Sequence, residues 1–246
     1  MPKIADAVIL MAGSGSRLQA SVPKPLVPIA GRPLISHIID HLFRAGVRKA
    51  HVVVGYESDR LLAGLEPLIP EGMQLHPIEN PLWQKQNGIS LLSADGQVNT
   101  PFVLTMADHL FEAAALNTLL QNAERDSLNL AIDRKIESIF DLDDAMKVQT
   151  ENGFVTAIGK SLTRYDAIDT GLFVCPSAIF SYLKAARKDD DCSLADGVRL
   201  MAQDQKVRAI DIGDGWWQDV DTDAMFARAE EELSARANEA RFACDR

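Results

Sequence analysis

A run of six apolar residues near the start of the chain, Ala7 to Ala12, ends abruptly at Gly13-Ser14-Gly15-Ser16. A continuous apolar run bounded by glycine is typical of a strand that is buried on both faces of a sheet. Such a strand needs helices on both sides to cover it. The run is too short for a membrane span or a signal sequence, so we expect a cytoplasmic protein.

The rest of the chain continues with alternating strand and helix patterns. Pro33, followed by apolar residues at helical spacing and then by Gly46, predicts a helix that starts at residue 33 and ends before 46. Further strands are expected at 50–54, 102–106, 128–132, 168–174 and 207–212, and further helices near 113–125, 177–187, 193–204 and 222–242. This alternation predicts an α/β fold with a Rossmann-like, mostly parallel sheet covered by helices on both faces.

The alternation is interrupted between residues 134 and 169. Two strand-like segments, 147–150 and 154–158, flank Asn152-Gly153, which supplies the positive φ values of a type I′ turn. We therefore expect a small antiparallel insertion at 134–169. Because no repeat or linker is visible elsewhere, residues 1–246 are expected to form a single domain.

Charge and cysteine content exclude several classes of protein. The 246 residues carry 25 basic and 35 acidic side chains, a net charge of −10, which argues against a nucleic-acid partner. The first 56 residues carry a net charge of +5, so an anionic ligand would bind near the N-terminal segment. The three cysteines are widely spaced and form no pair typical of a zinc site or a disulfide framework.

The glycine-rich loop after the first strand is suited to phosphate binding. Backbone N–H groups of glycines can approach phosphate oxygens closely, and Arg17 and Lys24 would add charged hydrogen bonds. The loop lacks the Gly-Lys-Ser/Thr of a Walker motif, and Pro23 and Pro25 interrupt the helix that a dinucleotide-binding loop requires. From the residues alone, a simple turn with two solvated basic side chains stays open.

The whole pattern L-x-A-G-x-G-x-R-L followed by P-K resembles the signature of nucleotidyltransferases, which join a nucleoside triphosphate to a phosphorylated small molecule. Within that family the chain is most similar to inositol-1-phosphate cytidylyltransferases. The segments that carry this likeness are NGISLLSA, FVLTMADH, DAMKV, AIGKSL, YDAIDTGLFV and WWQDVDT. The resemblance implies the nucleotide-diphospho-sugar transferase fold and transfer of a cytidylyl group from CTP to inositol 1-phosphate, with release of pyrophosphate.

The resemblance also implies a Mg²⁺ site. Its ligands would be Asp108, at the end of a central strand, and Asp219 of the W-x-D motif, with Asp221 as a third. Arg17 and Lys24 would be the catalytic residues, holding the triphosphate and the attacking group. The nucleotide would be bound by Ala12, Gly13, Ser14, Gly15, Asn87 and Ser90. From composition alone, the aspartates could equally be helix caps.

The acceptor is expected to bind to the insertion. Its candidate ligands are Arg134, Lys147, Lys160, Thr170 and Gly171. In this subfamily the transferase is often fused to a membrane-bound domain, whereas this chain ends in a polar helix. The resemblance therefore implies a stand-alone enzyme with a separate membrane-bound CDP-alcohol phosphotransferase as its partner.

Other functions remain open at this point. Phosphocholine or 2-aminoethylphosphonate could be the acceptor of the same chemistry, since the insertion is rich in acidic residues. A sugar 1-phosphate presents hydroxyl groups much like those of inositol. A nucleotide-sensing module without catalysis is the non-enzymatic alternative, which the retained lysine, arginine and aspartates argue against.

Overall fold

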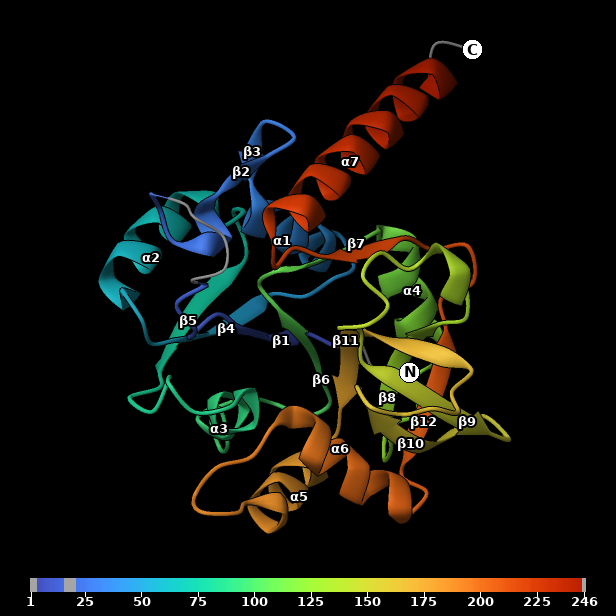
Figure 1. Ribbon diagram of the computed structural model, residues 1–246. Helices are drawn as coiled ribbons and strands as arrows, with labels where there is room; N and C mark the ends of the chain where they lie inside the picture. The colour runs from blue at the N-terminus through green and yellow to red at the C-terminus, as the bar shows by residue number, and fades with distance from the viewer. Residues whose placement is uncertain (1–3, 16–20, 245–246) are drawn as a thin grey trace.

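A nine-stranded sheet forms the centre of the protein (Figure 1), as seen in a computed structural model that describes residues 4–15 and 21–244, with side chains to residue 236. The strand order is β5-β4-β1-β6-β11-β8-β12-β10-β9. The strands are β1 (Asp6–Leu10), β4 (Lys49–Val54), β5 (Gln74–Glu79), β6 (Phe102–Met106), β8 (Leu128–Asp133), β9 (Lys147–Glu151), β10 (Phe154–Gly159), β11 (Ala167–Cys175) and β12 (Val207–Asp211).

The sheet is parallel in its first half and mixed in its second. β1 pairs in parallel with β4 and β6, and β4 pairs in parallel with β5. β11 runs antiparallel to both β6 and β8, and β12 returns to a parallel pairing with β8. The predicted α/β fold is confirmed, although β11 makes the sheet less uniformly parallel than the alternation of elements suggested.

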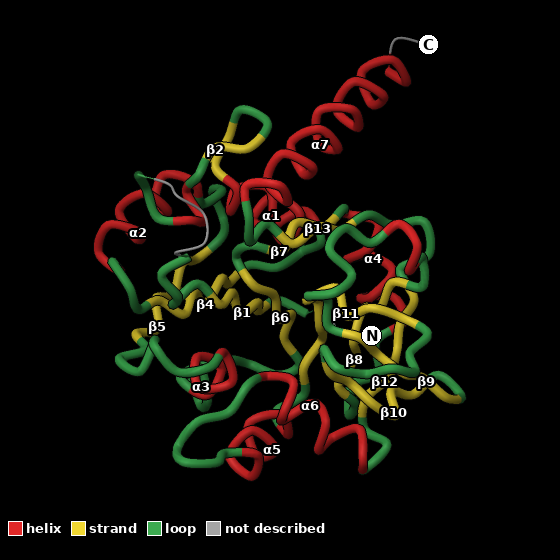
Figure 2. The backbone as a smooth tube through the Cα atoms, in the orientation of Figure 1, coloured by secondary structure: helices red, strands yellow, loops and turns green. Residues whose placement is uncertain are grey.

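Helices cover both faces of the sheet. One face carries α1 (Leu34–Arg44), α2 (Ser58–Leu65) and α4 (Ala113–Asn122), and the other carries α3 (Asn87–Leu92), α5 (Ala178–Ala186) and α6 (Leu194–Gln203). The tube in Figure 2 shows the sheet between these two layers. The last helix, α7 (Asp223–Cys244), extends away from the body (Figure 1). None of the helices in the described ranges is long and apolar enough to span a membrane.

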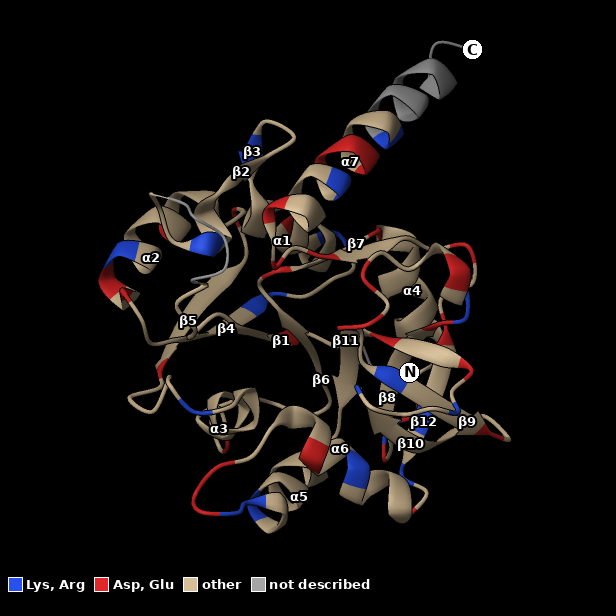
Figure 3. Cartoon of the chain, viewed as in Figure 1, with Lys and Arg blue, Asp and Glu red and all other residues tan. Residues whose placement is uncertain are grey.

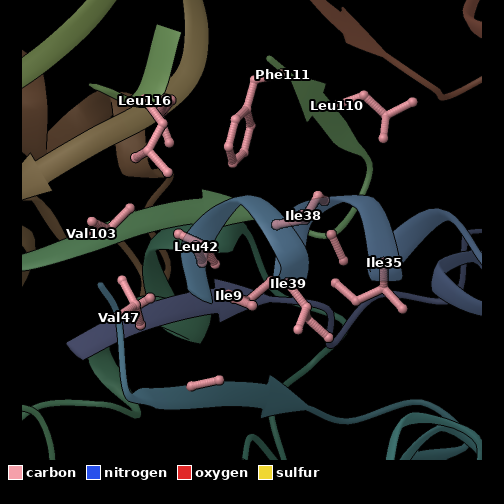
Figure 4. Packing of buried hydrophobic residues seen from close by; sticks show 14 of the residues in the cluster. Ile9, Ile35, Ile38, Ile39, Leu42, Val47, Val103, Leu110, Phe111 and Leu116 are labelled. Atoms are coloured by element: carbon pink, nitrogen blue, oxygen red, sulfur yellow. The ribbon is translucent and has the colours of Figure 1, made fainter. Parts of the chain in front are cut away.

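Two hydrophobic cores result, one on each face of the sheet. Along β1, Ala7 and Ile9 point into the core below α1 and α4, whereas Val8 and Leu10 point into the core of α3, α5 and α6. Figure 4 shows Ile9 of β1 below Ile38 and beside Ile39 of α1. A strand with both faces buried must be apolar at every position, which explains the unbroken run in the sequence.

The Asn-Gly hairpin forms as predicted and becomes part of the main sheet. Asn152 and Gly153 have φ values of 52° and 80°, as a type I′ turn requires, and join β9 to β10. β10 then pairs with β12, and β9 pairs with β11. The hairpin is therefore the outer edge of the large sheet rather than a separate subdomain.

Two short antiparallel pairs complete the described fold. β2 (Pro28–Ile29) pairs with β3 (Arg32–Pro33), and β7 (His109–Phe111) pairs with β13 (Trp217–Asp219). In the second pair His109 lies opposite Asp219. This pairing brings the segment after β6 next to a segment more than 100 residues later in the chain.

Candidate active site

One large cavity, of about 660 Å³, opens at the carboxyl ends of β1 and β6. In open α/β sheets, ligands bind at this edge. The cavity also reaches residues of β10, β11 and the hairpin loops, so both halves of the sheet contribute to it. The lining residues that the sequence had singled out are Ala12, Gly13, Gly15, Lys24, Asn87, Ser90, Asp108, Lys160, Gly171, Asp219 and Asp221.

Lys24 is at the centre of the acidic part of the cavity. Its Nζ donates to Asp108 Oδ2 at 2.7 Å and to Asp221 Oδ1 at 2.6 Å, and its side chain is only 9% exposed. Burial alone would lower the pKa of Lys24, but the two carboxylates outweigh burial and raise it. The amine therefore stays a cation at neutral pH, next to two anions.

The short turn after Pro23 fixes Lys24 in this position. Residues Lys24–Leu26 form a single turn of 3₁₀ helix, with Pro25 buried beside the lysine. Gly15 packs directly against Lys24: its φ is +59°, and a Cβ added there would lie 2.7 Å from Lys24 Cβ. The second glycine of the loop is thus required by its conformation and by its contact with the lysine.

Asp108, His109 and Asp219 form a compact cluster beside Lys24. Each offers a ligand atom within 4.8 Å of the other two. Asp219 Oδ1 is buried and accepts no hydrogen bond from the described residues. A buried carboxylate oxygen without a donor is costly unless a cation or water satisfies it. The cluster is therefore suited to a divalent cation, for which carboxylate oxygens are preferred ligands.

His109 orients this cluster. Its Nδ1 lies 2.9 Å from Asp108 Oδ1 and 4.0 Å from Asp219 Oδ1, and its ring stacks on Trp217 with centroids 6.4 Å apart. Burial lowers the pKa of His109, but Asp219 and Asp108 together raise it to about 9. Burial and the neighbouring charges of Asp108 and Asp221 raise the pKa of Asp219 to about 6. In contrast, Lys24 and His109 hold the pKa of Asp108 well below its usual range.

Gly171 lets β11 approach His109. Its φ is +73°, and a Cβ added there would lie 2.1 Å from His109 Cδ2. The N–H of Gly171 donates to Asp169 Oδ1 at 2.7 Å. Burial raises the pKa of Asp169 to about 6, against the opposing effects of the Gly171 N–H and His109. Asp169 lines the cavity and was not among the residues expected from the sequence.

Asn87 and Ser90 line the cavity from the first turn of α3. Asn87 Oδ1 accepts from the backbone N–H of Leu194 at 2.8 Å, and Ser90 Oγ accepts from Asn80 Nδ2 at 3.0 Å. Trp83 also lines the cavity. Ser14 is exposed and is not among the lining residues. Arg17 lies outside the described residues.

The hairpin side of the cavity contains fewer of the expected acceptor ligands. Lys160 lines the cavity and forms an ion pair with Asp144, which also lines it. Three others are not among the lining residues. Arg134 pairs with Asp166 and Asp211 on the surface, and Thr170 Oγ1 donates to the carbonyl of Ala131 at 2.8 Å.

Lys147 is the third expected ligand that does not line the cavity. It is buried at 8% exposure, and its amine binds backbone carbonyls. Its predicted contact with a phosphate is therefore not supported. The sequence alone does not predict these contacts, because backbone carbonyls of turns leave no recognisable pattern of side chains.

A further group of side chains lies on the β8 side of the cavity. Asp133 accepts from Trp217 Nε1 at 3.0 Å and from Lys135 Nζ at 2.8 Å. Lys135 Nζ also donates to the carbonyl of Gly213 at 2.6 Å. Asp133, Lys135 and Trp217 all line the cavity. Asp133 is the last residue of β8, so it lies at the same edge of the sheet as Asp108, which follows β6.

Comparison with known proteins agrees with this site. The model of the MobA-like NTP transferase domain matches residues 7–141, which include β1, the glycine-rich loop, Lys24 and Asp108. The chain belongs to this family. Family members bind a nucleoside triphosphate and a phosphorylated acceptor and use a divalent metal.

The curated relatives of this NTP transferase include bifunctional proteins. The chain is 30% identical to the bifunctional IPC transferase and DIPP synthase of Aquifex aeolicus, over 94% of this chain and 52% of that protein. It is 35% identical to the protein of the same name from Thermococcus kodakarensis, over 91% of this chain and 49% of that one. The chain thus spans about half the length of these relatives.

A solved structure shares the fold. The inositol-1-phosphate CTP transferase from T. maritima superimposes with a TM-score of 0.81 at 24% identity, covering 93% of this chain and 97% of that chain. A glucose-1-phosphate thymidylyltransferase from Bacillus anthracis, described as putative, superimposes with a TM-score of 0.79 at 18% identity. The nucleotide-diphospho-sugar transferase fold expected from the sequence is therefore confirmed.

Proposed function

We propose that this NTP transferase moves a cytidylyl group from CTP to inositol 1-phosphate, releasing CDP-inositol and pyrophosphate. The observation that carries the proposal is the cavity of about 660 Å³ whose lining brings together Lys24, Asp108, Asp219 and Asp221. The likeness to proteins named IPC transferase supports the choice of base and acceptor.

The reaction needs charge neutralisation more than proton transfer. The acceptor phosphate, with a second pKa of about 6, is already a dianion at neutral pH and can attack the α-phosphorus of CTP directly. Two anions must then be held in line while pyrophosphate leaves. No general base is required, so the protein's task is to position the phosphates and balance their charge.

Lys24 is the side chain best placed for that task. Its buried ammonium group would contact the α-phosphate and the incoming oxygen, where negative charge develops in the transition state. The backbone of Ala12 to Gly15 would wrap the triphosphate, and Arg17 would hold its β- and γ-phosphates. Asn87 and Ser90, with neighbouring Trp83, would frame the cytosine and ribose.

Asp108 and Asp219 would hold Mg²⁺, with Asp221 as a third carboxylate nearby. The buried Asp219 Oδ1, which accepts no hydrogen bond from the described residues, is the structural observation that fits a cation at this point. Bound there, Mg²⁺ would neutralise the triphosphate and assist departure of pyrophosphate. His109 keeps the Asp108 carboxylate turned toward the cavity through its Nδ1 contact.

The acceptor would bind on the hairpin side. Lys160 is a cation that lines the cavity there, and it would take the phosphate of the acceptor. Asp144 and Asp169 would accept hydrogen bonds from inositol hydroxyls, and the Gly171 backbone would lie beneath the ring. Arg134 and Thr170 would act only by supporting the surrounding strands.

We also propose that the enzyme works in the cytoplasm and that a separate membrane-bound CDP-alcohol phosphotransferase consumes its product. CDP-inositol contains an activated diphosphate bond, so the expected next reaction is transfer of its inositol phosphate group to the hydroxyl of an alcohol, with release of CMP. Co-purification of this chain with membranes that contain such an activity would test the partnership.

The decisive experiment measures pyrophosphate release with and without Mg²⁺, for each of the four NTPs against a panel of acceptors. The panel contains inositol 1-phosphate, phosphocholine, 2-aminoethylphosphonate and glucose 1-phosphate. We expect Mg²⁺-dependent turnover with CTP and inositol 1-phosphate. Preference for another acceptor would contradict the substrate assignment, and Mg²⁺-dependent CTP binding without turnover on any acceptor would indicate a nucleotide-sensing module.

A further inference from the structure

Lys147 occupies an unusual position for a lysine. It is the first residue of β9, where the strand pairs with both neighbours: Lys147 is opposite Gly159 of β10 and Ile168 of β11. Its exposed fraction is only 8%. A long charged side chain is seldom buried unless its charge and its three N–H donors are satisfied.

Backbone carbonyls surround the amine. Lys147 Nζ donates to the carbonyl oxygens of Leu142 and Lys160 at 3.0 Å each. The carbonyls of Asp143 and Ala145 lie at 3.3 and 3.5 Å, and the ring of Tyr165 lies 5.8 Å away. The donors of the amine are therefore engaged inside the protein and do not face the cavity.

These carbonyls belong to two separate segments. Residues 142–145 lie in the turns that precede β9, and Lys160 follows the end of β10. Within residues 142–145, the backbone N–H of Asp144 also donates to the carbonyl of Asp141 at 3.2 Å. The amine thus joins the turn at 142–145 to the end of the hairpin.

Both segments contribute side chains to the acceptor end of the cavity. Asp144 comes from the first segment and Lys160 from the second, and the two form an ion pair across the cavity wall. The spacing of this pair depends on how the two backbones are held together. Lys147 Nζ contacts both backbones.

We propose that Lys147 is a positioning residue, which fixes the acceptor end of the cavity by binding the backbones that carry Asp144 and Lys160. The proposal rests on the proposed function for the identity of the acceptor. Binding energy is lost when a site must be ordered during binding, so a preformed acceptor end lowers the concentration of acceptor that is needed. CTP, held at the other end, would be unaffected.

The test compares Lys147→Met with Lys206→Met. The second variant removes an exposed lysine at the start of β12, outside the cavity, by the same chemical change. For Lys147→Met we expect the KM for inositol 1-phosphate to rise about tenfold or more while the KM for CTP changes less than about twofold. Lys206→Met should leave both constants near the wild-type values.

Hydrogen exchange of the unliganded protein gives a readout that does not depend on activity. In Lys147→Met, peptides covering 139–146 should exchange at least about tenfold faster, whereas peptides covering β1, β4 and β6 should be unchanged. Unchanged exchange at 139–146, or an equal rise of both KM values, would overturn the proposal. If the wild type uses no inositol 1-phosphate, the proposed function fails while the exchange comparison still decides the role of Lys147.

A second variant serves if Lys147→Met does not fold. Lys147→Arg keeps the positive charge and the donors, but its planar group cannot reach all four carbonyls in the same geometry. We then expect the same selective rise in acceptor KM, at about threefold, with intermediate exchange at 139–146. Wild-type values for both quantities, or equal effects on CTP and acceptor, would contradict the proposal.

Discussion

At the scale of single residues, Lys24 is the side chain on which the proposed chemistry depends most. Its ammonium group is preorganised between Asp108 and Asp221, and removing one such donor typically lowers turnover by about 10²–10³. We expect that loss in Lys24→Met, measured as pyrophosphate release, with CTP still bound. Lys184→Met, which removes a lysine that is 60% exposed, is the matched control. Near-normal turnover of a folded Lys24→Met protein would refute the role.

Gly171 permits a second residue-scale prediction, because the chain offers a closely matched glycine. Gly171 and Gly96 have φ values of +73° and +76°, but a Cβ meets the His109 ring at Gly171 and open space at Gly96. Gly96→Ala should cost about 1–2 kcal/mol of stability from the backbone conformation alone. Gly171→Ala should cost more and should also reduce turnover, because it displaces His109. Equal urea midpoints and equal activities would show that the contact is unimportant.

At the scale of elements, the start of α1 is predicted to be sensitive to pH. His37 Nε2 lies 3.1 Å from the carbonyl of Ile29, and Arg32 Nε donates to His37 Nδ1 at 3.3 Å. Burial lowers the pKa of His37, with Arg32 and His41 adding to the effect, while the Ile29 carbonyl and Asp40 oppose it. The imidazole is therefore neutral in the folded protein at neutral pH.

The direction of the pH effect follows from this lowered pKa. Below about pH 6.5 the unfolded chain binds a proton at His37 more readily than the folded protein does, so stability falls as the pH decreases through that value. His37→Gln should flatten this part of the curve of unfolding free energy, measured by urea denaturation from pH 8 to pH 5. His76→Gln, on an exposed edge strand, is the control, and an unchanged slope in His37→Gln would exclude the assignment.

At the scale of the whole molecule, the two cores are predicted to unfold together, because they share one sheet. Ile39 of α1 and Ile179 of α5 are both fully buried, on opposite faces. Replacing either with Ala should cost about 2–5 kcal/mol. Both variants should shift one common transition, followed by circular dichroism and tryptophan fluorescence. Two separable transitions would instead indicate two domains within residues 1–246.

Charged residues of α7 connect this last helix to the body of the protein. Figure 3 shows acidic and basic residues alternating along the described part of α7, where Arg228 pairs with Glu232. Arg236 reaches Glu112 at the start of α4 and lies over the ring of Trp216. These contacts attach the first turns of α7 to the body, and Arg228, Glu232 and Arg236 line the far end of the cavity. The composition of the helix indicated its existence but none of these contacts.

What the amino-acid sequence determined by itself is local. Three features could be predicted because each depends only on a few neighbouring residues. The unbroken apolar run of β1 reflects burial on two faces, and the Asn152-Gly153 turn reflects a need for positive φ values. The glycine-rich loop reflects a close approach of the backbone. Lys24 and Asp108 were selected as site residues by the resemblance of their motifs to the nucleotidyltransferase signature, because the residues alone also allowed a solvated lysine and a helix cap.

What only the tertiary structure decided is how distant segments meet. The pairing of β7 with β13 brings His109 and Asp219 together, and the carbonyls around Lys147 come from turns on both sides of the hairpin. Lys147 and Lys160 look alike in the sequence, yet one is buried under backbone and the other faces the cavity. Side-chain direction depends on strand pairing across the sheet, and no local pattern of residues contains that information.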